Sequence, residues 1–466
     1  MADYPCLRWL CILLLLGLTG TTASAEIPYA GTSNDEAVHW LREYLQIDTT
    51  NPPGNEGEAT EFLAKILRAE GIEPQILVSP TGRSSLVARW KSPTSGGRAL
   101  GLMHHIDVVA AGEPWQQPPF SGRLVDGKIW GRGTLDVKGV GITQLAAVIG
   151  LKRDGVVLDR DVVLLAVADE EAGGLEGTGW LLDAHPELFE GLDGVINEGG
   201  SNRVVNDRLV WWGIEVVQKR PLWLEATARG RGGHASGLQT NSATHRLVKG
   251  LARLVEHPLR YRVTDAARTY LGALAELEGN RPNHLFFRLD TVIQPEGPTI
   301  SLSPGLPAYF VDTVQVTELR NGKGSNIISP VARASIDIRL LPDTDGDAKL
   351  AKVRELLGPD IELEVTLSSP IVDPSPTDHP VYRAFEEALG VRGPVIPTFM
   401  TGTTDSRFFR QRGIPAYGFS PFSLNSNDLQ GIHAIDESIP VKEFVRGISI
   451  TRRVIEAYGR PGFIPE

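Results

Sequence analysis

The sequence predicts an α/β protein, in which a mostly parallel sheet with helices on both faces forms the larger domain and an α+β lid domain with a four-stranded sheet is inserted into it. Three observations predict this class. Short, nearly all-apolar strand patterns alternate with helical patterns up to Asn197, as in a parallel sheet that is covered on both faces. Near Lys219 the order becomes strand, helix, strand, strand, helix, strand, and after about Pro376 the first alternation returns.

The elements of the larger domain follow in order. Helical patterns cover residues 34–45, 56–70 and 138–153, and apolar strand patterns cover residues 99–109, 161–168 and 194–197. A hairpin over residues 123–130 is expected to turn at Asp126-Gly127, because this dipeptide suits the positive φ angles of a tight hairpin turn. Beyond the insertion, a helix over 381–389 and a strand over 415–419 complete the domain.

The inserted lid domain is predicted over residues 219–370, between the two parts of the larger domain at 26–218 and 371–466. Its strands are expected at residues 222–228, 312–318, 332–340 and 361–367, and its helices at 242–256 and 347–357. The stretch 258–309 is rich in proline and has two patches of helical pattern but no clear periodicity. It is therefore predicted to be an elaborated loop.

Composition and charge restrict the function classes. The 466 residues are 41% hydrophobic and 22% charged, which is typical of a folded protein. The 46 Lys and Arg residues against 57 Asp and Glu residues give a formal net charge of -11. We expect no nucleic acid partner, because binding to a polyphosphate needs a basic surface.

Residues 1–25 are predicted to be a signal peptide. An apolar run over residues 9–18 follows Arg8, and Ala23-Ser24-Ala25 supplies the small residues of a cleavage site. The run is far shorter than the roughly 20 residues that span a bilayer, so a membrane anchor is the weaker alternative. We expect a periplasmic or secreted protein with no membrane span after cleavage.

Four polar clusters lie where strands of the larger domain end, and ligand sites of open α/β sheets lie at those carboxyl ends. They contain His105 with Asp107, Asp136, Glu170 with Glu171, and Glu198. Each cluster alone has an ordinary explanation: a buried structural histidine, a helix N-cap, a solvated acidic turn and a plain turn. Alternation places His105 and Asp107 on one face of their strand, so this carboxylate can orient the imidazole.

The order and spacing of these residues together indicate a metal site. Two divalent ions that share one carboxylate need about two further protein ligands each. These ligands are supplied by His105, Glu171, Glu198 and, far downstream, His433. Their nitrogen and oxygen donors suit Zn, Co or Mn, and both cysteines lie in the predicted signal peptide, so sulfur ligands are not expected. A second acid beside a ligand, Glu170, can act as a base.

On these motifs the chain resembles the di-zinc metallopeptidase family of aminoacylase, carboxypeptidase G, carboxypeptidase S and succinyl-diaminopimelate desuccinylase, over about residues 34–458. The resemblance implies a general-base role for Glu170 and a cis peptide bond between Asp136 and Val137. It implies two metal sites, one made by His105, Asp136 and Glu198 and the other by Asp136, Glu171 and His433.

Further motifs resemble lid and substrate-loop segments of that family. The Gly-Arg-Gly-Gly-His-Ala-Ser segment resembles its oxyanion motif, in which His234 would reach the active site of the partner subunit in a homodimer. Asn326 and Arg339 lie in segments that resemble those holding the substrate carboxylate. Gly402 and Thr403 lie in a segment that resembles the substrate loop.

The sequence therefore predicts an exported metallopeptidase or amidohydrolase of the zinc carboxypeptidase or aminoacylase type. Its substrate would be a small peptide, cleaved at the C-terminal residue, or an N-acyl amino acid, with water activated by two divalent ions, most simply Zn, and with Glu170 as general base. An aminopeptidase or dipeptidase of the same family is the alternative within the enzyme class. A periplasmic solute-binding protein is the alternative outside it, although such a protein needs no full set of metal ligands.

Overall fold

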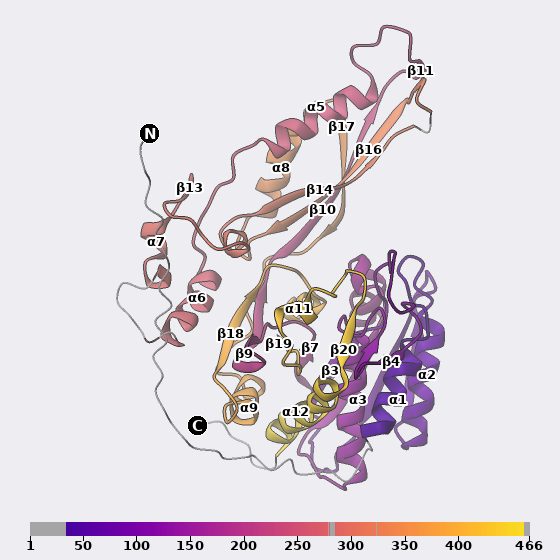
Figure 1. The fold of residues 1–466 in the computed structure, drawn as a ribbon, viewed down its shortest axis with the longest axis vertical. Coiled ribbons are helices and arrows are strands. Elements are labelled where there is room, and N and C mark those ends of the chain that lie inside the picture. The colour runs from indigo at the N-terminus through magenta and orange to yellow at the C-terminus, as the bar shows by residue number, and fades with distance from the viewer. Residues whose placement is uncertain (1–33, 278, 280–284, 323, 461–466) are drawn as a thin grey trace.

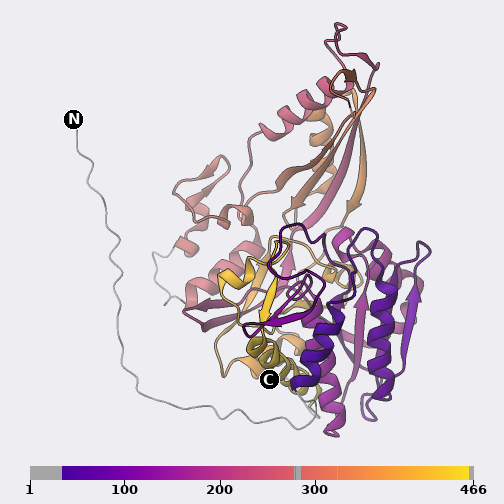
Figure 2. The ribbon, with the colours of Figure 1, turned by 45° about the vertical axis from the view of Figure 1, so that its right-hand side comes forward.

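The computed structural model describes residues 34–277, 279, 285–322 and 324–460. A larger α/β domain carries an elongated lid, which projects from it in both side views (Figures 1 and 2). The chain enters the lid through β10 (Arg220–Arg229) and leaves it through β17 (Ile361–Ser368). The predicted signal peptide lies outside the described residues. Of the described helices, none has the length and apolar character needed to cross a membrane.

The larger domain is built on one mixed sheet in the order β1-β2-β6-β3-β7-β19-β9-β18, with β8 paired to β9. Its strands are β1 (Pro74–Val78), β2 (Ser84–Trp90), β3 (Ala99–His105), β6 (Asp161–Val167), β7 (Leu192–Asn197), β8 (Arg203–Val205), β9 (Arg208–Gln218), β18 (Val395–Met400) and β19 (Ala416–Gly418). The central strands β6, β3, β7 and β19 are parallel, whereas β1 and β2 pair antiparallel at one edge. The predicted α/β class is confirmed, and the antiparallel edge is an addition to it.

Helices cover both faces of this sheet. The helices of the domain are α1 (Asn34–Tyr44), α2 (Glu56–Ala69), α3 (Lys138–Arg153), α4 (Trp180–Ala184), α9 (Pro380–Leu389), α10 (Ser406–Arg410), α11 (Ser426–Leu429) and α12 (Val441–Gly459). Every residue of β6 is buried, with Leu164 and its alternate neighbours in one apolar core and Leu165 and its alternate neighbours in another. Because successive side chains of a strand point to opposite faces, an apolar strand needs a layer on each side.

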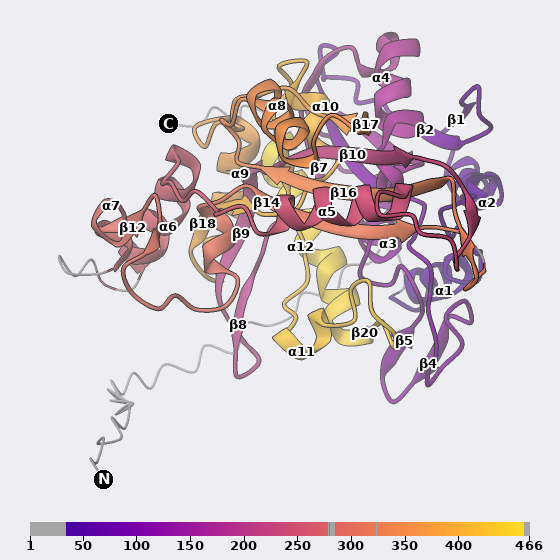
Figure 3. The same ribbon diagram turned by 90° about the horizontal axis from the view of Figure 1, so that it is seen from above.

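The lid contains the predicted four-stranded antiparallel sheet, in the order β14-β16-β10-β17. Its remaining strands are β14 (Thr313–Arg320) and β16 (Val331–Leu340), and its helices are α5 (Ala243–Val255) and α8 (Gly346–Leu357). Every second residue of β16 from Ala332 to Leu340 is buried in an apolar core with residues of α5 and α8. Seen from above, α5 lies in front of β16 (Figure 3). The lid therefore has a core of its own.

The segment between α5 and β14 contains a helix, α6 (Asp265–Leu277), although an elaborated loop is predicted there. It also contains α7 (Leu289–Val292) and the short strands β12 (Ile293–Gln294) and β13 (Gly297–Pro298). Helix α6 lies beside β18 of the larger domain (Figure 1), and its Tyr270 and Leu271 join the larger apolar core. The ring of Tyr309 lies 5.4 Å from that of Tyr270 and 5.4 Å from that of Phe399 in β18. This segment therefore packs on the larger domain rather than on the lid sheet.

The predicted hairpin is formed by β4 (Arg123–Val125) and β5 (Lys128–Trp130). Its turn lies at Asp126-Gly127, where φ is 51° and 71°. Strand β5 also pairs with β20 (Ser438–Pro440), which follows the segment that contains His433. The hairpin thereby brings a distant part of the chain next to the residues that precede α3.

At the tip of the lid, the short strands β11 (Gly233–His234) and β15 (Ile327–Ile328) pair antiparallel. This pair lies at the end of the lid that points away from the larger domain (Figure 1).

Candidate active site

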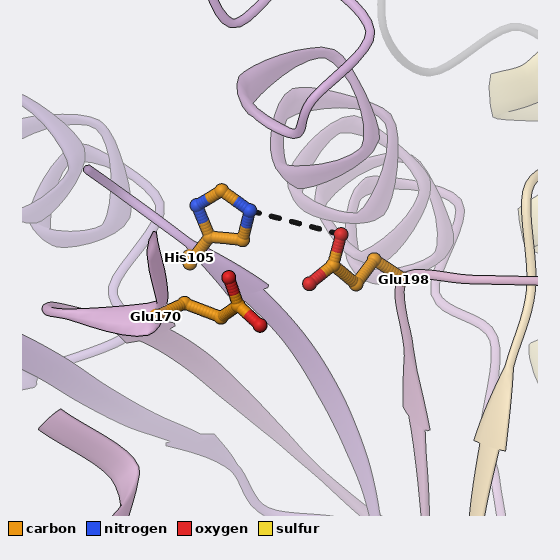
Figure 4. Close-up of side chains that lie close together, drawn as sticks. All are labelled: His105, Glu170 and Glu198. Carbon is orange, nitrogen blue, oxygen red and sulfur yellow. Dashed lines mark ion pairs between the residues drawn. The ribbon is translucent and has the colours of Figure 1, made fainter. Parts of the chain in front are cut away.

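Three predicted site residues meet at the carboxyl ends of the central strands. His105 ends β3, Glu198 directly follows β7, and Glu170 begins a 3-10 turn just after β6. Because these strands are parallel, their carboxyl ends meet at one edge of the sheet. Figure 4 shows the side chains of His105, Glu170 and Glu198 facing one another. We call residues 169–174, which carry Glu170 and Glu171, the active-site turn.

Asp136 and His433 come to this edge from outside the sheet. Asp136 precedes α3, and its peptide bond with Val137 is cis, as the family resemblance implies. The buried carboxylate of Glu437 accepts hydrogen bonds from the backbone N–H groups of Leu135 at 2.6 Å and Asp136 at 3.1 Å. These bonds hold the loop that carries Asp136 against the segment that carries His433.

Asp136 lies between two histidines. Its Oδ1 is 3.2 Å from Nε2 of His105, and its Oδ2 is 2.9 Å from Nε2 of His433. Oε2 of Glu198 lies 3.7 Å from the same nitrogen of His105, and Oε1 of Glu171 lies 3.4 Å from that of His433. The carboxylate of Asp136 is thus shared by two groups of side chains, each with one histidine and one further acid.

This arrangement fits divalent ions. Ligand atoms of His105, Asp136 and Glu171 lie within 4.8 Å of one another, and so do those of His105, Glu170 and Glu198. Oε1 of Glu171 is buried and accepts no hydrogen bond from the described residues, a deficit that a cation would satisfy. All donors are nitrogen or oxygen, as Zn, Co and Mn accept. The imidazole of His105 is buried, whereas that of His433 is 53% exposed, so the second group opens to solvent.

The acids of the cluster crowd one another. Burial raises the pKa of Glu198 to about 7, although the positive charge of His105 opposes this shift. Burial, with the negative charge of Glu198, also raises the pKa of Glu170. A hydrogen bond to Asp136 raises the pKa of His433 to about 10. Without ions, protonated histidines therefore offset the carboxylates, and a divalent cation would replace those protons.

Asp107 supports the site through its backbone as well as its side chain. Nδ1 of His105 donates to the carbonyl oxygen of Asp107 at 2.8 Å, whereas the nearer carboxylate oxygen is 3.8 Å away. The carbonyl, rather than the predicted carboxylate, is therefore the closer partner that orients the imidazole. The carboxylate accepts hydrogen bonds from the N–H groups of Glu170 and Glu171 at 3.1 Å each, and from Nδ2 of Asn51 at 2.8 Å. Its main contacts are thus with the active-site turn.

Two of the predicted lid residues lie apart from this cluster. His234 is exposed in β11 at the tip of the lid, with Nδ1 2.7 Å from Oγ of Ser236. The backbone N–H of Ala235 donates to the carbonyl of Asn326 at 2.9 Å, so Asn326 lies at the same tip. Within one chain, neither residue joins the cluster, and the expected role of His234 in a partner subunit stays a prediction.

Arg339 lies closer to the larger domain. Its guanidinium pairs with the carboxylate of Asp337 at 2.7 Å and lies 5.5 Å from the ring centre of Trp223. A Cβ atom on Gly173 would lie 3.6 Å from Trp223, so this part of the lid touches the active-site turn.

Gly402 and Thr403 follow β18, and Oγ1 of Thr403 accepts a hydrogen bond from Nε2 of Gln218 at 3.1 Å. Two residues later, Asp405 is fully buried against the active-site turn, since a Cβ atom on Gly174 would lie 2.1 Å from its Oδ1. Burial raises the pKa of Asp405 to about 6. The only sequence signal for Asp405 is its place in the substrate-loop motif.

Known proteins are similar to this chain in sequence and in fold. Residues 101–457 match the profile of peptidase family M20/M25/M40. Aminoacylase-1 of Homo sapiens is 28% identical over 437 residues, which cover 92% of this chain and 97% of that protein. Probable carboxypeptidase S-like 2 of Dictyostelium discoideum is 26% identical over 391 residues, which cover 77% of this chain and 72% of that protein.

Among solved structures, an M20 family metallo-carboxypeptidase from Sulfolobus solfataricus has a TM-score of 0.69 at 20% identity, over 91% of this chain and 99% of that one. The resemblance inferred from the motifs is thereby confirmed. Because the family match spans most of the chain, the protein belongs to peptidase family M20/M25/M40 and is a hydrolytic enzyme.

Proposed function

We propose that the protein is a metal-dependent hydrolase that cleaves an amide bond next to a free carboxylate, in a C-terminal peptide residue or an N-acyl amino acid. The observation that carries this proposal is the placement of Asp136 between His105 and His433, with the spare acid Glu170 in the same cluster. The names of the relatives, aminoacylase and carboxypeptidase, support this substrate class. A solute-binding protein is no longer an alternative, because the family is one of hydrolytic enzymes.

Two divalent ions would be held at the cluster. The proposed ligands are His105, Asp136 and Glu198 for one ion, and Asp136, Glu171 and His433 for the other. Zn is the simplest choice for this donor set, with Co or Mn as alternatives. When bound, such ions would lower the pKa of the attacking water and polarise the scissile carbonyl.

Glu170 is the proposed general base. Burial and the charge of Glu198 raise its pKa, which suits a group that takes and returns a proton near neutral pH. Its carboxylate takes a proton from the attacking water and gives it to the amine nitrogen as the carbon–nitrogen bond breaks. Asp107 keeps the base in place by accepting the backbone N–H of Glu170.

Arg339 is proposed to hold the substrate carboxylate, because a guanidinium can pair with a planar anion through two parallel hydrogen bonds. Gly402 and Thr403 are proposed to line the substrate loop. Asn326 and His234 lie at the lid tip, so they would serve the active site of a second copy, with His234 donating to the oxyanion. The proposal therefore includes a homodimer.

We also propose that the protein is exported to the periplasm or secreted, on the signal-peptide pattern of residues 1–25. Cell fractionation with N-terminal sequencing of the product tests this, with cleavage after Ala25 as the expected result. A cytoplasmic protein with an intact N-terminus would contradict it.

A screen of N-acyl amino acids and dipeptides on the Zn- or Co-loaded mature protein tests the function. We expect hydrolysis of N-blocked substrates with a free C-terminal carboxylate, loss of activity on chelation and recovery with Zn or Co. An aminopeptidase or dipeptidase, the alternative function, would instead prefer substrates with a free amine. If C-terminally amidated substrates are cleaved as well as the free acids, the proposed recognition of the carboxylate is wrong.

A further inference from the structure

We propose that Arg83 is a positioning residue for the reaction, which holds the active-site turn in the geometry that Glu170 and Glu171 require. This inference rests on the proposed function for the roles of those two acids. Arg83 lies in the turn between β1 and β2, outside every motif of the site.

The guanidinium of Arg83 joins two buried carboxylates that belong to different elements. Nη1 donates to Oδ1 of Asp169 at 2.7 Å. Nε donates to Oε1 of Glu56, the first residue of α2, at 2.9 Å, and Nη2 also contacts that carboxylate. A third carboxylate, that of Asp107, has its Oδ2 3.9 Å from Nη2. The fork of Arg83 therefore fixes Asp169 to the N-terminus of α2.

Asp169 connects Arg83 to Glu170 and Glu171. It has a left-handed backbone, with φ 73°, and directly precedes Glu170 and Glu171. Its carbonyl oxygen accepts the backbone N–H of Gly174 at 2.6 Å, which closes the turn, and its Oδ2 accepts that of Glu176, just beyond the turn, at 3.0 Å. Asp107 accepts the N–H groups of the two acids from the other side. Asn51 links the two supports, because it donates to Asp107 at 2.8 Å and accepts from Arg83 at 3.4 Å.

Charge and burial make this arrangement specific for arginine. The carboxylates of Glu56, Asp107 and Asp169 are 1%, 0% and 7% exposed, and Arg83 is the cation that these three share. Lysine would keep the charge, but its single ammonium nitrogen cannot reproduce the planar fork whose separate nitrogens donate to Glu56 and to Asp169. The shape of the guanidinium, and not only its charge, is thus what the turn requires.

A simpler role would be to neutralise buried acids and nothing else. The two roles predict different effects of a second substitution on stability and on kcat. Arg83→Gln changes the summed formal charge of residue 83 and the three carboxylates from -2 to -3, because the charge of the guanidinium is lost. Adding Glu56→Gln restores -2 but leaves Asp169 without its arginine donor. If Arg83 only neutralised the acids, the second substitution would restore both stability and kcat. If Arg83 positions the turn, the second substitution would not restore kcat.

The experiment compares Arg83→Lys, Arg83→Gln and the double variant Arg83→Gln/Glu56→Gln in the full mature chain. The readouts are the melting temperature of the metal-free protein, the Zn dissociation constants by competition with a chelating dye, and kcat and KM for the best substrate of the screen. Arg89→Gln is the matched control. Arg89 lies in the neighbouring β2, pairs with Asp161 at 3.1 Å, and is at the other end of the strand.

We expect Arg83→Lys to melt close to wild type, yet to lose about 10- to 100-fold in kcat or in the affinity of the weaker Zn site, as is typical when support of a metal ligand is removed. The double variant should regain the melting temperature lost by Arg83→Gln but not its kcat, with KM little changed. Wild-type kcat and Zn affinity in Arg83→Lys, or recovery of kcat together with stability in the double variant, would overturn the proposal. If the wild type hydrolyses no substrate, the proposed function fails, while the Zn affinities still decide whether Arg83 positions the turn.

Discussion

Glu170 is the side chain whose replacement separates proton transfer from metal binding. Its pKa is raised by burial and by the charge of Glu198, as suits a group that exchanges a proton near neutral pH. We expect Glu170→Gln to lower kcat by about 10²- to 10⁴-fold, because glutamine keeps the shape of the side chain but cannot take the proton. Steady-state kinetics on a cleaved substrate and metal analysis of the purified variant measure the two properties separately.

Neither proposed ligand set contains Glu170, so this variant should hold as many ions as wild type. Glu176→Gln is its control, since Glu176 follows the active-site turn and accepts a hydrogen bond from Thr81 at 2.7 Å, away from the cluster. Loss of an ion in Glu170→Gln would make Glu170 a ligand instead, which its position beside His105 and Glu198 permits geometrically.

Position 174 requires glycine for two reasons, a positive φ angle and the close approach of another side chain. Its φ is 64°, and a Cβ atom there would lie 2.1 Å from Oδ1 of the buried Asp405. Gly155 has a φ of 69°, but a Cβ atom on it would meet nothing within 4 Å. Gly155→Ala should therefore cost only the backbone strain of about 1 to 2 kcal/mol. Gly174→Ala should cost about 1 to 3 kcal/mol more, because Asp405 must move.

Urea unfolding of the two glycine variants measures this difference in the free energy of unfolding. Since Asp405 lies against the active-site turn, activity should fall in Gly174→Ala and persist in Gly155→Ala. Equal losses of stability would show that Asp405 moves away without cost.

Among the elements, those with a local pattern were predictable. Helix α3 spans the predicted residues 138–153, and β6 lies within the apolar run 161–168. Strand β9 is not predicted, because Glu215 and Gln218 interrupt its apolar pattern. Glu215 is buried and pairs with Arg410 at 2.9 Å, and this partner lies 195 positions further along the chain. A contact between residues so far apart in the sequence cannot be recognised from the pattern of neighbouring residues.

The same distinction applies to the site. That His105, Asp136, Glu171, Glu198 and His433 come together could be predicted, because their order and spacing match the family motifs, although Asp136 and His433 do not lie at the ends of strands of the large sheet. Two contacts could not be predicted: the hydrogen bond from His105 to the carbonyl of Asp107 and the hydrogen bond from Arg83 to Asp169. They depend on turn geometry and on contacts between separate elements.

The link between β9 and β10, where the chain passes from the larger domain into the lid, makes the free energy of unfolding depend on pH. Lys219 is buried there and donates to the carbonyl of Val311 at 2.8 Å. Burial lowers its pKa from 10.5 to about 8, with Asp312 opposing the shift and Arg339 adding to it. Between these pH values the unfolded chain binds the proton more strongly than the folded chain. The destabilising contribution of Lys219 is therefore fully present below pH 8 and disappears as the pH rises to 10.5.

We expect the stability of wild type relative to Lys219→Met to rise with pH across this window, by at most about 1.4 kcal/mol per pH unit. Urea unfolding of both proteins at several pH values from 7 to about 10 measures the difference. Lys352→Met, on the exposed side of α8, controls for the change in net charge. A constant difference over the window would mean that Lys219 stays charged in the folded protein.

In the whole molecule, the candidate metal site depends on the complete fold of the larger domain. Its proposed ligands extend from His105 to His433, and the lid is inserted between Glu198 and His433. The lid has its own apolar core, whereas α6 joins the core of the larger domain. Because the unfolded chain cannot bring these ligands together, ion binding and folding should be linked.

Metal removal tests this linkage. Bound ions would relieve the repulsion between the clustered acids, so Zn should raise the melting temperature of the chelator-treated protein. A free Zn concentration 100-fold above the dissociation constant would add about 2.7 kcal/mol for each site. His433→Ala should lower the bound Zn from two ions per chain to one and shrink the shift. His39→Ala should do neither, because His39 is exposed on α1 and pairs with Glu43, at 3.3 Å, outside both proposed ligand sets. A wild-type protein that binds a single ion would contradict the proposal that Asp136 is shared by two ions, since its carboxylate would then have only one cation to hold.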